Sequence, residues 1–242
     1  MESIVDKSGS FIASQFRSLE GMRAASARGL VGPAVTISHQ TGCGAHEIAK
    51  RLAEILQRAE PKKQQPWTVL DRQLVEKALD EHHWPRELAE KMPEDKRSFV
   101  EDVLDELFGL RPPSWVLVPQ VVETMLHLVE AGHVILIDRG ATVVTTQLPN
   151  VFHVRLVASL AKRIGRVQDS RKLTVKAATE FVEKEDRGRQ RYVKANFHAR
   201  LDNELFYHMV VNTDRLPCAD AAEVIAQGAI RCFQARSVPG SI

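Results

Sequence analysis

The residues best suited to chemistry lie in a turn that contains two glycines, within residues 38–44. A short apolar segment rich in β-branched residues, 34–37, precedes this turn, and residues 45–56 follow it with apolar side chains at helical spacing. The first N–H groups of a helix have no intrahelical partner, and glycines let backbone amides close around an anion. The pattern predicts either a phosphate-binding loop or a tight strand–helix turn that binds nothing, because the lysine of the full P-loop signature is absent.

Carboxylates and arginines follow other apolar runs. Asp71 ends one run, Asp138 and Arg139 end another, and Arg163 and Arg166 lie on the helix expected after a third. Ligands of parallel sheets bind outside the carboxyl ends of the strands, so these side chains are expected around the glycine turn. Arginine forks match phosphate oxygens, and a carboxylate holds Mg²⁺ directly or through water. As alternatives, Asp71 could cap the following helix, and the Asp138-Arg139 pair could form a structural turn.

A basic segment, residues 186–192, has arginines at alternate positions. Arg187 and Arg191 lie four residues apart, hence on one helical face. Arg189 points in another direction, where it would serve the fold or the solvent. The segment could close over a polyphosphate, or it could be an ordinary solvated basic helix.

Around these residues the sequence predicts alternating strands and helices. The apolar runs expected as strands are residues 34–37, 67–70, 133–137, 152–157 and 207–211. Helical patterns are expected at residues 45–56, 73–83, 97–108, 119–131, 160–167, 174–182 and 220–233. This alternation predicts an α/β fold in which helices cover both faces of a parallel sheet.

Size and composition narrow the class of protein. With 242 residues, 44% of them hydrophobic, the chain can bury a full core in one domain with an insertion. The formal net charge is only +2, so the electrostatic potential of the protein does not indicate binding to nucleic acid. The three cysteines (Cys43, Cys218 and Cys232) lack metal-ligand spacing and suit a reducing compartment. No apolar run approaches the roughly 18 to 20 residues that span a bilayer, and residues 1–20 do not form a signal peptide pattern. We therefore expect a cytoplasmic protein with no membrane or nucleic-acid partner.

Taken together, these residues resemble the cytidylate kinase-like family of P-loop proteins, which are relatives of nucleoside monophosphate kinases. The resemblance covers roughly residues 34–225 and depends on the order and spacing of several short motifs. These are Thr36-Ile37-Ser38, Gly42-Cys43-Gly44, Glu47-Ile48-Ala49, Leu70-Asp71, Asp138-Arg139-Gly140-Ala141, Phe152-His153-Val154-Arg155-Leu156, Asp186-Arg187, Arg191-Tyr192, Tyr207 and Asn212-Thr213. The resemblance implies a P-loop NTPase-type three-layer sandwich whose five-stranded parallel sheet has the order 2-3-1-4-5.

The resemblance also implies an organisation along the chain. Residues 31–236 would form the kinase-like domain, with a helical acceptor-binding insert at 73–132 and an arginine-bearing lid at 186–203. Outside the range of the resemblance, apolar residues at helical spacing predict a helical extension within residues 1–30, and residues 237–242 are expected to be a loose tail.

The expected site uses ATP and Mg²⁺ to phosphorylate a nucleoside monophosphate, with CMP as one candidate, or a similar small acceptor. The residues expected to bind the nucleotide donor are Gly42, Cys43, Gly44, Ala45, His46, Glu47 and Arg163. Those expected to bind the acceptor are Asp71, Arg139 and Asp186. Those expected to act in catalysis are Asp138, which would also hold the metal, Arg139, Arg187 and Arg191.

The loop departs from the family pattern. Alignment on Gly44 places Ala45 where nucleotide kinases have the loop lysine, and no Ser or Thr follows; the nearby side chain is Glu47. The lysine normally contacts the β- and γ-phosphates, and the hydroxyl binds Mg²⁺. The positive charge that neutralises the phosphates must then come from Arg139, Arg163 or the arginines of the lid. The alternatives are a nucleotide-binding or regulatory protein that kept the fold without turnover, and a structural α/β domain with no nucleotide site.

Overall fold

The computed structural model describes residues 32–60, 65–71, 118–137 and 140–236. The expected N-terminal extension, the helices expected at 73–83 and 97–108, and the C-terminal tail lie outside these residues. Within the described ranges, every helix is too short or too polar to cross a bilayer.

The core of the fold is a five-stranded parallel sheet. Its strand order, β2-β3-β1-β4-β5, confirms the order predicted from the sequence. The strands are β1 (Ala34–His39), β2 (Thr68–Asp71), β3 (Val134–Ile137), β4 (Val151–Val157) and β5 (Met209–Asn212). Strand β1 lies at the centre, where Val35 pairs with Ile135 of β3 and with Phe152 of β4. Because β1 has neighbours on both sides, its first five residues are all buried.

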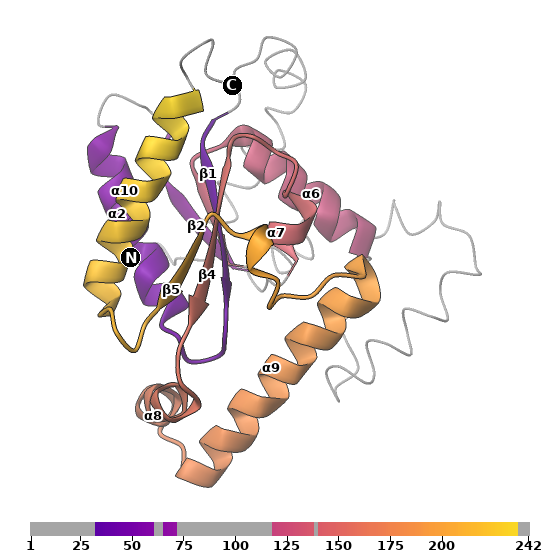
Figure 1. The fold of residues 1–242 in the computed structure, drawn as a ribbon, viewed down its shortest axis with the longest axis vertical. Coiled ribbons are helices and arrows are strands. Elements are labelled where there is room, and N and C mark those ends of the chain that lie inside the picture. The colour runs from indigo at the N-terminus through magenta and orange to yellow at the C-terminus, as the bar shows by residue number, and fades with distance from the viewer. Residues whose placement is uncertain (1–31, 61–64, 72–117, 138–139, 237–242) are drawn as a thin grey trace, which may run out of the picture.

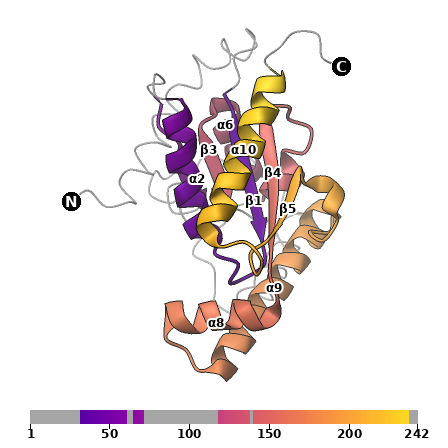
Figure 2. The ribbon, with the colours of Figure 1, turned by 60° about the vertical axis from the view of Figure 1, so that its left-hand side comes forward.

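Helices cover both faces of the sheet and complete three layers (Figures 1 and 2). Helices α2 (Ala45–Ala59) and α10 (Cys218–Arg236) pack on one face. Helices α6 (Val118–Ala131) and α7 (Ala141–Val144) pack on the other. The side chains of β1 alternate between the two, so Val35 packs with the first pair of helices while Ala34 packs with the second.

Helices α8 (Leu160–Arg171) and α9 (Val175–Phe197) form a hairpin beyond the carboxyl ends of the strands (Figures 1 and 2). Ser159 caps α8, and Thr174 caps α9 by accepting a hydrogen bond from the N–H of Ala177. Val167 of α8 packs against Ala178 and Val182 of α9. The hairpin therefore has an apolar interior of its own and lies at the edge where a ligand is expected.

Two sequence-based assignments need correction. Strand β5 begins at Met209, not at Tyr207, because a 3₁₀ helix, η2 (Glu204–Phe206), precedes it and the Tyr207 hydroxyl donates to Ser38 and to the carbonyl of Leu201. The apolar spacing of residues 160–167 predicts that Leu160 lies on the apolar face of α8 and Arg163 lies elsewhere, but Leu160 is 43% exposed whereas Arg163 is buried. The glycine turn packs against the Arg163 side of α8 and covers it.

Candidate functional site

The turn after β1 requires glycine at two positions. Gly42 has φ +85° and Gly44 has φ +82°, in the left-handed region that L side chains rarely adopt. A Cβ atom on Gly42 would lie 2.5 Å from the carbonyl oxygen of Arg163, and one on Gly44 would lie 2.7 Å from Sγ of Cys218. Between them, Cys43 is buried, and its N–H donates to the carbonyl of Gln40 at 3.2 Å. Conformation and close packing together fix this backbone.

The turn leads directly into the N-terminus of α2. Gly44 occupies the N-cap position, and no side chain caps the helix. The first-turn N–H groups are therefore left for solvent or a ligand, and the partial positive charge of the helix dipole adds to them. Ala45, the first helical residue, is buried at the position where nucleotide kinases carry lysine, so the turn presents backbone donors without a side-chain cation.

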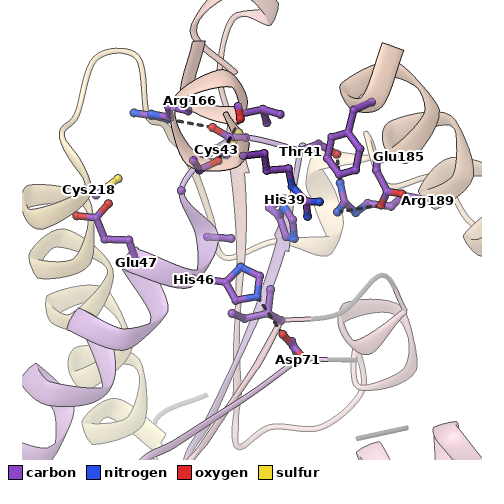
Figure 3. Close-up of a pocket in the computed structure, with 18 of the residues that line it drawn as sticks. His39, Thr41, Cys43, His46, Glu47, Asp71, Arg166, Glu185, Arg189 and Cys218 are labelled. Carbon is purple, nitrogen blue, oxygen red and sulfur yellow. Dashed lines mark hydrogen bonds and ion pairs between the residues drawn. The ribbon is translucent and has the colours of Figure 1, made fainter. Parts of the chain in front are cut away.

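A cavity of about 870 Å³ lies over this turn at the carboxyl edge of the sheet (Figure 3). Its volume falls within the range of roughly 300 to 1,000 Å³ that is common for small-molecule sites. The wall combines β1, the glycine turn, the start of α2, the end of β2, and both helices of the α8–α9 hairpin. The position agrees with the rule that open parallel sheets bind ligands beyond their carboxyl ends.

A charged network ties the glycine turn to the hairpin. The Asp186 carboxylate accepts from the N–H and the hydroxyl of Thr41 at 2.8 and 2.7 Å. Nη1 of Arg163 donates to the same carboxylate at 2.5 Å and to the carbonyl of Thr41 at 3.2 Å. Thr41 is therefore held through its N–H, carbonyl and hydroxyl groups by two helices. Asp186 was expected to bind the acceptor, but both of its carboxylate oxygens are hydrogen-bonded within the protein. Arg163 was expected to bind the nucleotide donor, but it is hydrogen-bonded to the backbone of the turn.

Three arginines line the described cavity wall, and two of them lie beside the glycine turn. Arg189 of α9 is hydrogen-bonded through Nη1 to Thr41 Oγ1 and lies 3.3 Å from Asp186 Oδ1, and its side chain is only 12% exposed. Arg166 of α8 donates to the hydroxyl and carbonyl of Thr213, both at 2.9 Å, and reaches the carbonyl of Gly42 at 3.4 Å. Both guanidinium groups therefore lie beside the glycine turn in fixed orientations.

On another side of the cavity, His46 meets Asp71. Nε2 of His46, in the first turn of α2, lies 3.0 Å from Oδ2 of Asp71 at the end of β2 (Figure 3). The neighbouring Glu47 also lines the cavity and accepts from Nη2 of Arg51 at 3.1 Å. The sequence identified His46, Glu47 and Asp71 separately, and the fold brings them to one cavity.

His39, at the end of β1, lines the cavity with an uncharged imidazole ring. Burial and the Arg189 guanidinium lower the pKa of His39 to about 3 from its ordinary 6.5, so the ring is uncharged at neutral pH. Its Nδ1 lies 3.0 Å from the carbonyl of Gln40, which places the proton on Nδ1 and leaves Nε2 as an acceptor. Burial also raises the pKa of the Cys43 thiol to about 11, so this cysteine in the turn is not a thiolate nucleophile.

The remaining expected residues lie elsewhere. Arg187 and Arg191 line a separate groove on α9 with Lys184 and Lys194, and the Arg187 side chain is 65% exposed beside Glu183. In this structure neither arginine lines the cavity, so their position does not support the catalytic role expected of them. Asp138 and Arg139 lie outside the described residues.

Sequence reasoning missed the position of Arg189. Its signal was present, because Arg189 follows Glu185 and Asp186 at helical spacings of four and three residues, and both of these carboxylates contact it. Arg166 was expected near the glycine turn but was given no binding or catalytic role. Thr41 and His39 carry no sequence signal that separates them from other turn residues.

An all-parallel sheet of this order, with a glycine turn between β1 and α2, defines an α/β protein of the P-loop type. Comparison with known families gives the more particular result. The model of the cytidylate kinase-like family matches residues 34–215, and the chain belongs to that family.

One solved structure supports the fold. An uncharacterized protein from Eubacterium ventriosum ATCC 27560 superposes with a TM-score of 0.57 at 15% identity, over 84% of this chain and 99% of that chain. Shikimate kinase from Bacteroides thetaiotaomicron gives a TM-score of 0.40 at 14% identity, over 84% of this chain and 98% of that chain, which is too low a score to inform function. A comparison with curated proteins found no match.

Proposed function

We propose that the protein is an ATP-dependent phosphotransferase. The triphosphate of ATP lies on the glycine turn, and its γ-phosphoryl group passes to a small acceptor, either the phosphate of a nucleoside monophosphate such as CMP or the hydroxyl of a comparable small molecule. The observation that carries this proposal is the uncapped N-terminus of α2 behind two left-handed glycines, facing a cavity with two oriented arginines. Phosphoryl transfer depends mainly on positioning and charge stabilisation, and both are what this arrangement supplies.

Arginines replace the loop lysine in this proposal. The described part of the cavity wall contains no lysine, and Ala45 offers no charge. Arg189 and Arg166 approach the turn from α9 and α8 and are held by Thr41 and Thr213. A guanidinium fork matches phosphate oxygens, so the two could together stabilise the charge that spreads over the transferring group.

A bound Mg²⁺ would be held at this site chiefly by the phosphates of the nucleotide. Mg²⁺ usually keeps several waters and is bound by substrate phosphates with one or two carboxylates, so it does not require a protein cage. The described cavity wall contains carboxylates, Glu47 and Asp71 among them, that could take part in that mode, while no group of three or more His, Cys, Asp or Glu side chains within the described ranges could hold a metal alone. The carboxylate expected for this role, Asp138, lies outside the described residues. Bound Mg²⁺ would neutralise charge between the β- and γ-phosphates.

A second candidate is a nucleotide-binding protein without turnover. The substitution of alanine for the loop lysine favours it, since this lysine is a direct phosphate contact in nucleotide kinases. Both candidates share the same binding mode at the turn and differ only in whether the arginines suffice for catalysis.

One experiment separates these functions. ATP binding is measured by calorimetry with and without Mg²⁺, and ADP release is then measured by a coupled assay across nucleoside monophosphates and small alcohols. Binding followed by acceptor-dependent ADP release supports the phosphotransferase. Binding without release supports the non-catalytic protein, and no binding would leave a structural α/β domain. For glycine substitutions that test this site, Gly165→Ala is the matched control, because a Cβ atom at Gly165 meets no heavy atom within 4 Å.

A further inference from the structure

The pair formed by His46 and Asp71 has a geometry that phosphate binding alone does not require. The two residues come from different elements, the first turn of α2 and the end of β2, and strand β3 lies between β1 and β2 in the sheet. Their side chains nevertheless meet at 3.0 Å between Nε2 and Oδ2, and both line the cavity.

The contact fixes which ring nitrogen of His46 is available. A carboxylate accepts a hydrogen bond and cannot donate one when ionised, so Nε2 carries the proton and the lone pair is on Nδ1. Among the described residues, Nδ1 of His46 has no hydrogen-bond partner. The side chain of His46 is 68% exposed and that of Asp71 is 23% exposed, so a ligand can reach the ring while its anchor is partly enclosed.

The described residues on the His46 side of the cavity include no arginine or lysine that would favour an acceptor phosphate. The arginines of the described wall come from α8 and α9, whereas the His46 side carries the carboxylate of Asp71 and the neutral ring of His39 (Figure 3). A phosphate monoester is an anion at neutral pH and its attacking oxygen carries no proton to remove. A hydroxyl group is neutral and must lose a proton as it attacks phosphorus.

We propose that the acceptor is an alcohol whose hydroxyl is deprotonated by His46, with Asp71 as the positioning residue that holds the imidazole. This inference rests on the proposed phosphotransferase function and narrows its acceptor to a hydroxyl-bearing small molecule. The chemistry is balanced with ATP as the co-substrate. The acceptor oxygen bonds to the γ-phosphorus while its proton passes to Nδ1 of His46. The bond from the γ-phosphorus to the β,γ-bridging oxygen breaks, and its electron pair leaves with ADP.

Asp71 then has a defined task in each state of His46. Before transfer its carboxylate keeps the proton on Nε2, and after transfer it stabilises the imidazolium until the proton passes to water. A positioned general base commonly contributes about 10²- to 10⁴-fold to a rate. The pair is therefore expected to affect turnover much more than ATP binding.

The test uses the full chain with ATP and Mg²⁺, and a panel of ribonucleosides, monosaccharides and small polyols beside nucleoside monophosphates. We expect ADP release with a hydroxyl acceptor. We expect His46→Ala to lower kcat by about 100-fold or more while ATP affinity changes little, and added imidazole to restore part of kcat. Asp71→Asn should lower kcat with partial rescue in Asp71→Glu. Lys50→Ala, on the same helix but outside the cavity wall, is the matched control.

The outcomes separate this inference from the function on which it rests. ATP-dependent transfer to nucleoside monophosphates alone would overturn the inference and leave the phosphotransferase standing. Full activity in His46→Arg would also overturn it, because arginine can contact phosphate but cannot act as the base. If the protein does not bind ATP, the proposed function fails and the inference fails with it.

Discussion

The carboxylate of Asp186 binds both the N–H and the hydroxyl of Thr41, at 2.8 and 2.7 Å, although the two residues are 145 positions apart. Thr41 precedes the first glycine of the turn, and Asp186 lies midway along α9. Arg163 donates to the same carboxylate from α8. The shape of the glycine turn and the position of the hairpin are therefore coupled through one carboxylate.

We predict that Asp186→Ala destabilises the protein by about 2 to 4 kcal/mol, because it leaves the buried guanidinium of Arg163 without its charged partner. The free energy of unfolding is measured by urea denaturation. Asp202→Ala is the control, since Asp202 pairs with Arg200 on the surface, and surface pairs contribute little. Equal stability of the two variants would show that the network does not hold the turn.

Gly44→Val is expected to weaken ATP binding by tenfold or more while the sheet remains folded. Valine strongly disfavours φ +82°, and its Cβ atom would lie 2.7 Å from Sγ of Cys218. Calorimetry gives the affinity and circular dichroism the fold, with Gly165→Ala as the control. Unchanged ATP affinity in a folded Gly44→Val protein would exclude this turn as the nucleotide site.

The position of the glycine turn followed from the sequence because it depends on local patterns. The apolar run of β1, the glycines, and the apolar face of α2 are contiguous, and each of their periodicities can be read directly. The family resemblance supplied the order of the strands, which local patterns cannot give.

The orientation of the arginines on α9 did not follow from the sequence. Arg187 and Arg191 share a helical face, but which face meets the cavity depends on what α9 packs against. Tyr192 and Val193 are buried against Val143 of α7, and this packing turns Arg189 toward the glycine turn. The contact between His46 and Asp71 depends likewise on strand order and could not be read from either residue alone.

The pH dependence of stability should reveal that His39 is uncharged in the folded protein. Its pKa is about 3 in the folded protein against 6.5 when unperturbed, so between these values the unfolded chain binds a proton that the folded chain does not. Stability is therefore lost as pH falls below 6.5, at up to about 1.4 kcal/mol per pH unit from this residue. His39→Gln should lose about 1 to 2 kcal/mol less than the parent protein between pH 7 and pH 5, as measured by urea denaturation at each pH. Identical losses would show that His39 takes up its proton while folded.

The last prediction concerns which arginine of α9 meets the charge of the transferring phosphoryl group. Arg189 lines the cavity at the glycine turn and is 12% exposed, whereas Arg187 is 65% exposed on a different groove. If the protein is a phosphotransferase, Arg189→Ala should lower kcat by about tenfold or more, since it removes a preorganised cation from a site without a loop lysine. Arg189→Lys should recover only part of this loss, because lysine cannot form the bidentate fork.

Arg187→Ala is the matched control from the same helix and should leave kcat nearly unchanged, because the exposed pair of Arg187 with Glu183 at 3.8 Å contributes little. The unfolding free energy of each variant must be measured beside kcat, since Arg189 also binds Thr41 and its loss could loosen the turn. A fall in the kcat of Arg189→Ala that is larger than the fraction of unfolded protein accounts for would show that Arg189 stabilises the charge on the transferring phosphoryl group. The opposite ranking, with Arg187→Ala the more damaging variant, would mean that α9 rotates or shifts when the nucleotide binds, so that the face carrying Arg187 and Arg191 closes over the phosphates.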